Sequence, residues 1–196
     1  MRPWPAICAV LLLGGCNMVH TDHPLFKAAD AAGAPTFRPG IWADPDPGCN
    51  FDPNRPVKTW PDCAHGDAAP KAEPGATLLI VAGKPLIMQY GGKPADDQPG
   101  SPPVYYYFGL EPLRLDASGR IIAMKAWPVQ CGPPRRQGRT HHSPYGTRHP
   151  LPGMTMDADG NNCTTASIDA VRAAATPSEA WADKPGGAYW VRDGDQ

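Results

Sequence analysis

The sequence predicts an α+β fold, with a mainly antiparallel β-sheet or half-closed barrel and one or two short C-terminal helices. Three observations predict it. Runs rich in β-branched and aromatic residues recur through the middle of the chain, Gly and Pro separate them, and the clearest helical spacing comes late, in residues 165–175. With 26 Pro and 21 Gly among 196 residues, the domain is expected to be rich in loops but folded.

Residues 77–90 carry the clearest β signal. The runs Thr-Leu-Leu-Ile-Val (77–81) and Leu-Ile-Met-Gln-Tyr (86–90) flank the short connection Ala-Gly-Lys-Pro. Two such runs around a glycine-containing connection predict a β-hairpin. Pro85 has no backbone N–H to give to a neighbouring strand, so we expect it in the turn or at the first position of the second strand.

The next strands are predicted on either side of a turn at residues 116–119. Residues 104–108 include Tyr-Tyr-Tyr-Phe, and residues 113–115 alternate apolar and charged side chains. The sequence Asp-Ala-Ser-Gly then suits a turn in which Gly119 takes a positive φ, and residues 120–127 return as a strand. With the preceding hairpin, these segments give at least four antiparallel strands.

Residues 39–63 begin with a predicted short strand at 41–43 and continue as a loop rich in Pro, Asp and Asn. The segment also carries Trp42 and Trp60. We expect the two indoles to pack together as a small satellite core, because large aromatic side chains are usually buried.

Residues 165–175 are the best helix candidate because their apolar side chains recur at helical spacing. A second helix is predicted to start at Thr176, which can cap it. Pro177 suits the first turn and Glu179 completes a capping box. Residues 188–191 are predicted to form the last strand.

The first fifteen residues have the form of a secretory signal. Arg2 supplies a positive charge, residues 7–13 are apolar, and Gly14 and Gly15 are the small residues that a signal peptidase needs near its cut. The apolar run is far shorter than the ~20 residues of a transmembrane helix. We therefore expect residues 1–15 to be removed.

The residues Leu13, Gly14, Gly15 and Cys16 resemble, position by position, the cleavage and lipidation motif of bacterial lipoproteins. The resemblance implies a diacylglyceryl group on the Cys16 thiol, an acyl chain on its new amine, and the lipid bilayer as partner. The residue after Cys16 is Asn17 and not Asp. The resemblance therefore favours the outer membrane, facing the periplasm, over the inner membrane. The alternative is an ordinary secretory signal in which Cys16 is incidental.

Residues 16–35 follow as a lipidated N-terminus and flexible tether, since they lack a sustained apolar period, and residues 36–196 form one disulfide-bonded, β-rich domain. The segment 39–63 and the regions around Cys131 and Cys163 loosely resemble uncharacterised envelope lipoproteins. That resemblance implies no assigned activity.

Four cysteines remain after removal of the signal and lipidation of Cys16: Cys49, Cys63, Cys131 and Cys163. An even number in an exported chain indicates disulfides, with three possible pairings. We favour Cys49–Cys63 and Cys131–Cys163, because each closes a compact segment bounded by turns. A four-cysteine zinc site would need closer pairs than these spacings provide.

Several residues could carry chemistry, and none forms a recognisable catalytic or metal site. His141, His142 and His149 share a loop in which no regular spacing enforces a geometry. Asp157, Asp159 and Asn161 alternate like calcium ligands, but Asn162 and Ile168 occupy the positions that require Gly and Glu. We therefore predict a turn before Cys163, with no catalytic residues, metal or cofactor.

Composition and motifs together predict a non-catalytic structural or binding module on the membrane, acting through an envelope protein partner. The formal net charge of −1 argues against a nucleic-acid partner. The alternative, from a different class, is a periplasmic hydrolase or metal-dependent enzyme that uses the loop from His141 to His149. No nucleophile elbow, phosphate-binding loop or Cys-x-x-Cys pair supports a particular reaction.

Overall fold

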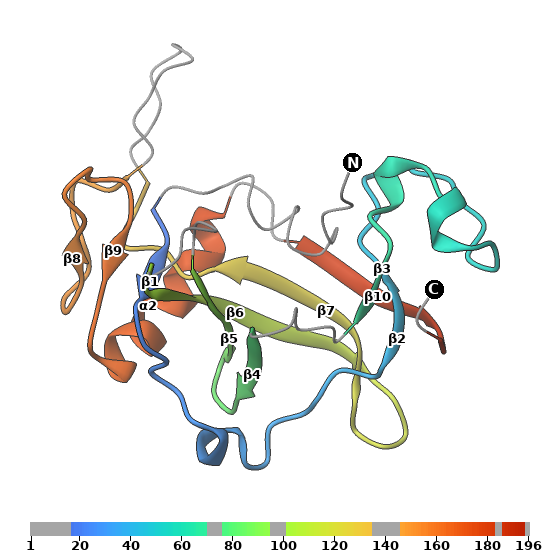
Figure 1. Ribbon diagram of the computed structural model, residues 1–196, viewed down its shortest axis with the longest axis horizontal. Coiled ribbons are helices and arrows are strands. Elements are labelled where there is room, and N and C mark those ends of the chain that lie inside the picture. The colour runs from blue at the N-terminus through green and yellow to red at the C-terminus, as the bar shows by residue number, and fades with distance from the viewer. Residues whose placement is uncertain (1–16, 70–75, 95–100, 135–145, 183–185, 195–196) are drawn as a thin grey trace, which may run out of the picture.

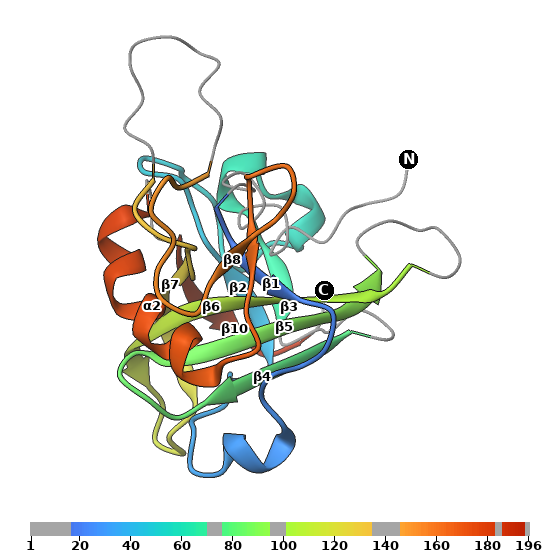
Figure 2. The same ribbon diagram turned by 90° about the vertical axis from the view of Figure 1, so that its left-hand side faces the viewer.

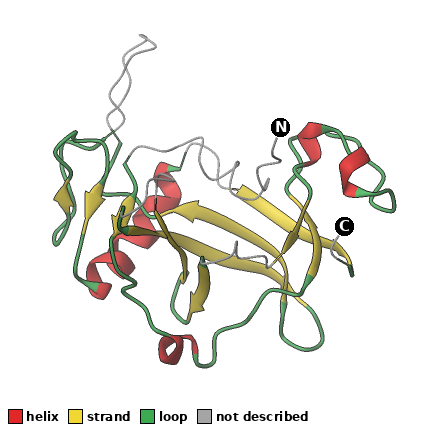
Figure 3. Ribbon diagram, in the orientation of Figure 1, coloured by secondary structure: helices red, strands yellow, loops and turns green. Residues whose placement is uncertain are grey.

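The computed structural model describes residues 17–69, 76–94, 101–134, 146–182 and 186–194. It confirms the α+β class: ten strands form one sheet, and a single α-helix accompanies them within the described residues (Figures 1 and 3). The sheet is not closed into a barrel, so the half-closed barrel that the sequence left open is not the architecture.

The elements follow one another in a simple order along the chain. The strands are β1 (Val19–Thr21), β2 (Gly40–Ala43), β3 (Asp67–Ala69), β4 (Thr77–Val81), β5 (Leu86–Pro94), β6 (Pro103–Leu115), β7 (Ile121–Pro128), β8 (Thr155–Met156), β9 (Cys163–Thr164) and β10 (Gly186–Arg192). The helices are the short 3-10 turns η1 (Ala28–Ala31), η2 (Val57–Thr59) and η3 (Asp62–Ala64), and the α-helix α2 (Ile168–Trp181).

The sheet runs in the order β3-β2-β10-β7-β6-β1-β9-β8, and the hairpin β4–β5 joins it through β5 and β6. Neighbouring strands are antiparallel except for β1 and β9, which are parallel. Both predicted hairpins are confirmed. Residues 103–115 form one strand where the sequence suggested two shorter ones, and the turn at Asp116–Gly119 leads into β7, as predicted.

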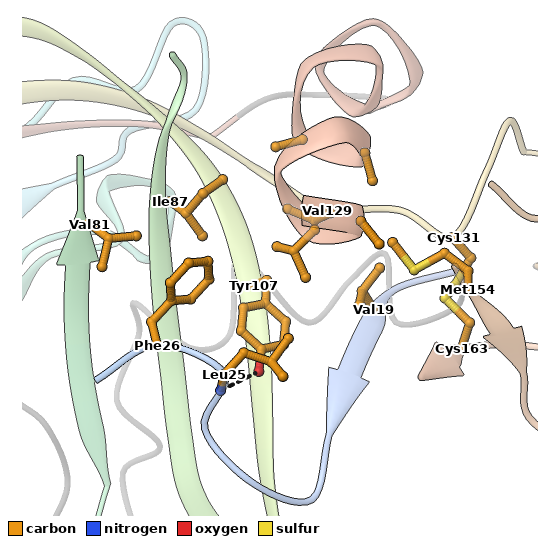
Figure 4. Packing of buried hydrophobic residues seen from close by; sticks show 14 residues of the cluster. Val19, Leu25, Phe26, Val81, Ile87, Tyr107, Val129, Cys131, Met154 and Cys163 are labelled. Carbon is orange, nitrogen blue, oxygen red and sulfur yellow. Dashed lines mark hydrogen bonds between the residues drawn. A yellow bond between two sulfur atoms is a disulfide. The ribbon is translucent and has the colours of Figure 1, made fainter. Parts of the chain in front are cut away.

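Alternation along the central strands builds a core on each face of the sheet. On β6, Tyr107 belongs to a first cluster, whereas Phe108 and Leu110 belong to a second. The same switch of face occurs between Ile87 and Met88 on β5, as the period of two requires. The first cluster, drawn in Figure 4, includes residues of α2 and lies between this helix and the sheet. Figure 2 shows α2 beside β6 and β7.

The predicted second helix at Thr176 is wrong, because α2 continues through Pro177 to Trp181. Proline cannot donate the helical backbone hydrogen bond, yet packing holds the helix on both sides of it. The hydroxyl of Ser178 donates to the carbonyl of Ala174 at 2.7 Å, and the indole of Trp127 donates to the carbonyl of Ala175 at 2.8 Å.

The predicted tether is also wrong for residues 17–26, which belong to the folded domain. Strand β1 lies between β6 and β9, and Val19 is fully buried. Further on, the backbone N–H and carbonyl of Phe26 bind the buried side-chain amide of Gln89 at 2.9 and 3.1 Å. These long-range contacts supply the order that the local sequence does not indicate.

The two tryptophans expected to pack together lie in different clusters. Trp42 is buried in the second core, edge-on to Phe37 with ring centroids 5.5 Å apart. Trp60 lies in the segment closed by the first disulfide, where its ring is 4.5 Å from that of Phe51. The disulfide segment therefore has an aromatic pair of its own, formed by Phe51 and Trp60.

Candidate functional site

The structure joins Cys49 to Cys63 and Cys131 to Cys163, the pairing that the sequence analysis favours. The Cα atoms are 5.7 Å apart in the first pair and 5.8 Å apart in the second, within the normal range for disulfides. Cys131 and Cys163 are both fully buried in the first core cluster, so this bridge ties two loops to the centre of the domain (Figure 4).

The predicted lipidation residue and most of the histidine loop lie outside the described residues. These are Cys16, His141 and His142. The remaining histidine of the loop, His149, is described and exposed, and its backbone N–H is bound by the hydroxyl of Thr147 at 3.1 Å. The described part of the loop thus brings no second histidine or carboxylate to His149.

The segment with Asp157, Asp159 and Asn161 forms the predicted turn before Cys163. The N–H of Gly160 donates to the carbonyl of Asp157 at 2.9 Å. The backbone N–H and the side-chain amide of Asn161 both donate to the carboxylate of Asp159, which lowers the pKa of that carboxyl. Local hydrogen bonds therefore hold Asp159 and Asn161 in this turn.

An ionisable pair that the sequence analysis missed joins β1 to this turn. Nε2 of His20 lies 2.8 Å from Oδ2 of Asp157, and both side chains are about a quarter exposed. Tyr106 lies beside His20, with ring centroids 6.3 Å apart. Burial raises the pKa of the Tyr106 hydroxyl, and the nearby negative charge of Asp157 raises it further.

His20 also lines an open groove of about 820 Å³ along β1 and the loop before α2. Hydroxyl groups dominate its polar lining, and several of them already serve the backbone. The hydroxyl of Thr165 accepts from the N–H of Ser167, and that of Ser167 caps α2 by accepting from the N–H of Ala170. The groove is lined by His20, Thr21, Asp22, His23, Pro102, Pro103, Val104, Gly153, Thr155, Thr164, Thr165, Ala166 and Ser167.

Comparison with known protein families, with curated proteins and with solved structures finds no match. Among the described residues, no helix is both long and apolar enough to cross a membrane.

Chemically, the pair of His20 and Asp157 can hold an imidazole in a fixed orientation and share a proton. Nucleophilic catalysis would also need a hydroxyl or thiol bound to that imidazole. Within the part of the chain that the structure describes, the hydrogen-bond partner of the His20 ring is the carboxylate of Asp157, and no three His, Cys, Asp or Glu side chains group as metal ligands would. The contact between His20 and Asp157 joins the turn to β1.

No regular sequence spacing indicates a role for His20, because its partner, Asp157, is 137 residues away. The available signal was weaker: His20 stands between two β-branched residues, Val19 and Thr21.

Proposed function

We propose that this protein is an envelope lipoprotein, anchored through lipid on Cys16 and working as a non-catalytic structural or binding module. The observation that carries the proposal is the Leu13-Gly14-Gly15-Cys16 pattern placed directly ahead of a domain with two disulfide bridges. Two or more buried acyl chains make membrane anchoring stable.

The disulfides support the export that this role requires. Disulfides form and persist in oxidising compartments such as the bacterial periplasm and are rare in the cytosol. The bridge between Cys131 and Cys163 is part of the buried core, so the fold suits an oxidising compartment. Asn17, the residue after the lipidated cysteine, favours a location at the outer membrane, with the domain on its periplasmic side.

Mass spectrometry of the N-terminal peptide, taken from protein extracted from membranes, tests the anchor. We expect the mature chain to begin at Cys16 carrying the diacylglyceryl group and an acyl chain. Cys16→Ser should remove the membrane-bound protein, whereas Cys8→Ser, within the apolar part of the signal, should leave processing unchanged. An unmodified Cys16, or cleavage at another position, overturns the proposal.

The binding role needs a separate experiment. Cross-linking in intact cells followed by purification from detergent extracts should recover a defined envelope protein in a fixed ratio to this one. The Cys16→Ser protein, which lacks the site of lipid attachment, is the matched control. Separation of the two membranes by density then decides between outer and inner membrane, and enrichment in the inner membrane contradicts the proposed location.

A further inference from the structure

Asn17, the first described residue, directly follows the proposed lipid attachment and is part of the folded domain. Asn17 is 3% exposed, and its backbone carbonyl accepts from the N–H of Cys131 at 2.9 Å. Its side-chain amide donates to the carbonyl of Gly132 at 2.8 Å and to Oε1 of Gln130 at 3.0 Å. Its φ of 79° lies in the left-handed region, which Asn tolerates better than most residues.

The residues after Asn17 are held equally firmly. The N–H of Met18 donates to the side chain of Asn162 at 3.0 Å, and its carbonyl accepts from the N–H of Cys163 at 3.2 Å. The N–H of Val19 donates to the carbonyl of Val129 at 2.9 Å. These hydrogen bonds fix the backbone from Asn17 to Val19. Covalent geometry places the Cα of any residue only ~3.8 Å from that of its neighbour, so a lipid on Cys16 would be attached directly beside this fixed segment.

Three loop segments surround this start and form what we call the Asn17 rim: residues 132–134, 146–150 and 158–162. They are fastened to one another. Pro134 and Thr147 form a β-bridge, and a Cβ on Gly146 would meet the carbonyl oxygen of Gly160, so the backbones are in close contact. Exposed described residues of the rim include Pro133, Arg148 and Asp159.

We propose that the Asn17 rim rests on the headgroup surface of the bilayer, held there because no tether separates the domain from the lipid on Cys16. The inference rests on the lipidation proposed above. The partner of this surface is the membrane, because the residue that would carry the acyl chains is covalently joined to Asn17 at the centre of the rim.

The composition of the rim sets the depth of the contact. The large apolar side chains that are exposed in the described residues are Leu113, Leu115, Ile168 and Tyr189, and all four lie outside the rim. A rim of Pro, Gly, Asn and charged side chains suits headgroups and not hydrocarbon. We therefore expect the rim to touch the surface without entering the acyl region.

The contact also fixes which end of the sheet lies far from the membrane. Strand β7 ends at Pro128, close to the rim, and starts at Ile121, beside the turn that follows β6. Its eight residues span about 26 Å at ~3.3 Å per residue. The tip of the β6–β7 hairpin, with Ser118, thus points away from the bilayer at the opposite end of the strand from β1, β8 and β9 (Figure 1).

Nitroxide labels on the lipidated protein in vesicles with nickel-chelating headgroups test this placement. Ala158→Cys and Arg148→Cys put labels on exposed positions of the rim, and Ser118→Cys puts a matched label on the distal turn. Peptide mapping without reductant first verifies that each variant keeps both native disulfides. Collisional relaxation of both rim labels should be several-fold faster than that of the Ser118 label.

A second variant isolates the role of the missing tether. An insertion of Asn followed by five Gly-Ser repeats between Cys16 and Asn17 keeps Asn beside the lipidated cysteine and adds a span of about 18 Å root-mean-square. The relaxation of the rim labels should then fall to that of the Ser118 label. Rim labels that stay relaxed after the insertion would overturn the proposal.

The outcomes separate this inference from the proposed function. A mature chain without lipid on Cys16 overturns both. A lipidated chain whose rim and Ser118 labels relax equally fast overturns only the placement of the rim and leaves the lipoprotein proposal standing.

Discussion

The side-chain nitrogen of Asn17 lies 2.8 Å from the carbonyl oxygen of Gly132, a residue 115 positions later in the chain. This hydrogen bond locks the first described residue of the domain into a buried site next to the bridge between Cys131 and Cys163.

Asn17→Asp should destabilise the purified mature protein by about 2–4 kcal/mol, because a buried carboxylate would replace an amide that donates to two acceptors. Chemical denaturation in detergent measures the change. Asn17→Gly, which keeps the positive φ but loses both side-chain bonds, should cost less. A stability of Asn17→Asp within ~0.5 kcal/mol of the original protein contradicts the role assigned to the amide.

Tyr107→Phe should loosen the N-terminal segment. The buried Tyr107 hydroxyl lies 2.6 Å from that of Thr21 and accepts from the N–H of Leu25 at 3.3 Å (Figure 4). Its removal leaves the Leu25 N–H without an acceptor and should cost about 1–3 kcal/mol. Hydrogen exchange should quicken at Leu25. Tyr105→Phe, on the same strand, is the control, and equal exchange in the two variants refutes the expectation.

Ser178→Ala should destabilise the domain by about 1–3 kcal/mol, measured by thermal or chemical unfolding. The fully buried Ser178 hydroxyl accepts from the N–H of Gln130 at 2.8 Å and donates to the carbonyl of Ala174, so the change leaves the N–H of Gln130 without this acceptor. Thr176→Ala, at an exposed position of the same helix, should stay within ~0.5 kcal/mol of the original. Similar losses in both variants would contradict the role assigned to the Ser178 hydroxyl.

The two disulfides should contribute unequally to the stability of the domain. Replacing Cys131 and Cys163 together by Ser should lower stability more than replacing Cys49 and Cys63, because the former sulfurs are fully buried in the core and their bridge closes the longer loop. Loss of a native bridge typically costs ~2–5 kcal/mol.

Unfolding of the two double variants measures the disulfide difference, and the Cys49/Cys63 variant should change mainly the fluorescence of Trp60. Peptide mapping without reductant supplies the control on connectivity. A linked peptide from Cys49 to Cys131 or to Cys163 would show that the native pairing is different.

The turn of the β6–β7 hairpin should lose stability in acid. The carboxylate of Asp116 accepts from the backbone N–H groups of Arg120 and Ser118 and from the Arg120 guanidinium, and these bonds hold its pKa below the usual value. Because the folded pKa is depressed, the stabilisation is present above the unfolded pKa, ~3.9, and is lost as the pH falls through the folded pKa. The protection of the Ser118 amide against hydrogen exchange should fall with this loss. In Asp116→Asn, this protection should no longer change with pH over the same range. A turn whose exchange responds to acid equally in Asp116→Asn refutes the assignment.

Local patterns alone predicted a good part of the fold. The hairpin at residues 77–90 and the turn at Asp116–Gly119 are set by short alternating runs and turn residues that are close in sequence, so both appear where expected. The helix predicted at residues 165–175 from apolar spacing is present, and it begins at Ile168. The lipidation of Cys16 is a sequence prediction that the described residues do not test.

The sequence by itself thus determined the two hairpins and the presence of the late helix, because each depends on neighbours within a few tens of residues. It favoured one of three possible cysteine pairings. Only the tertiary structure decided that Val19–Thr21 form a strand, that α2 continues through Pro177, and that His20 meets Asp157. Strand β1 has three residues, and its partners lie on β6 and β9. A segment that short gains its order from burial and hydrogen bonds to distant strands, and no local pattern records those contacts.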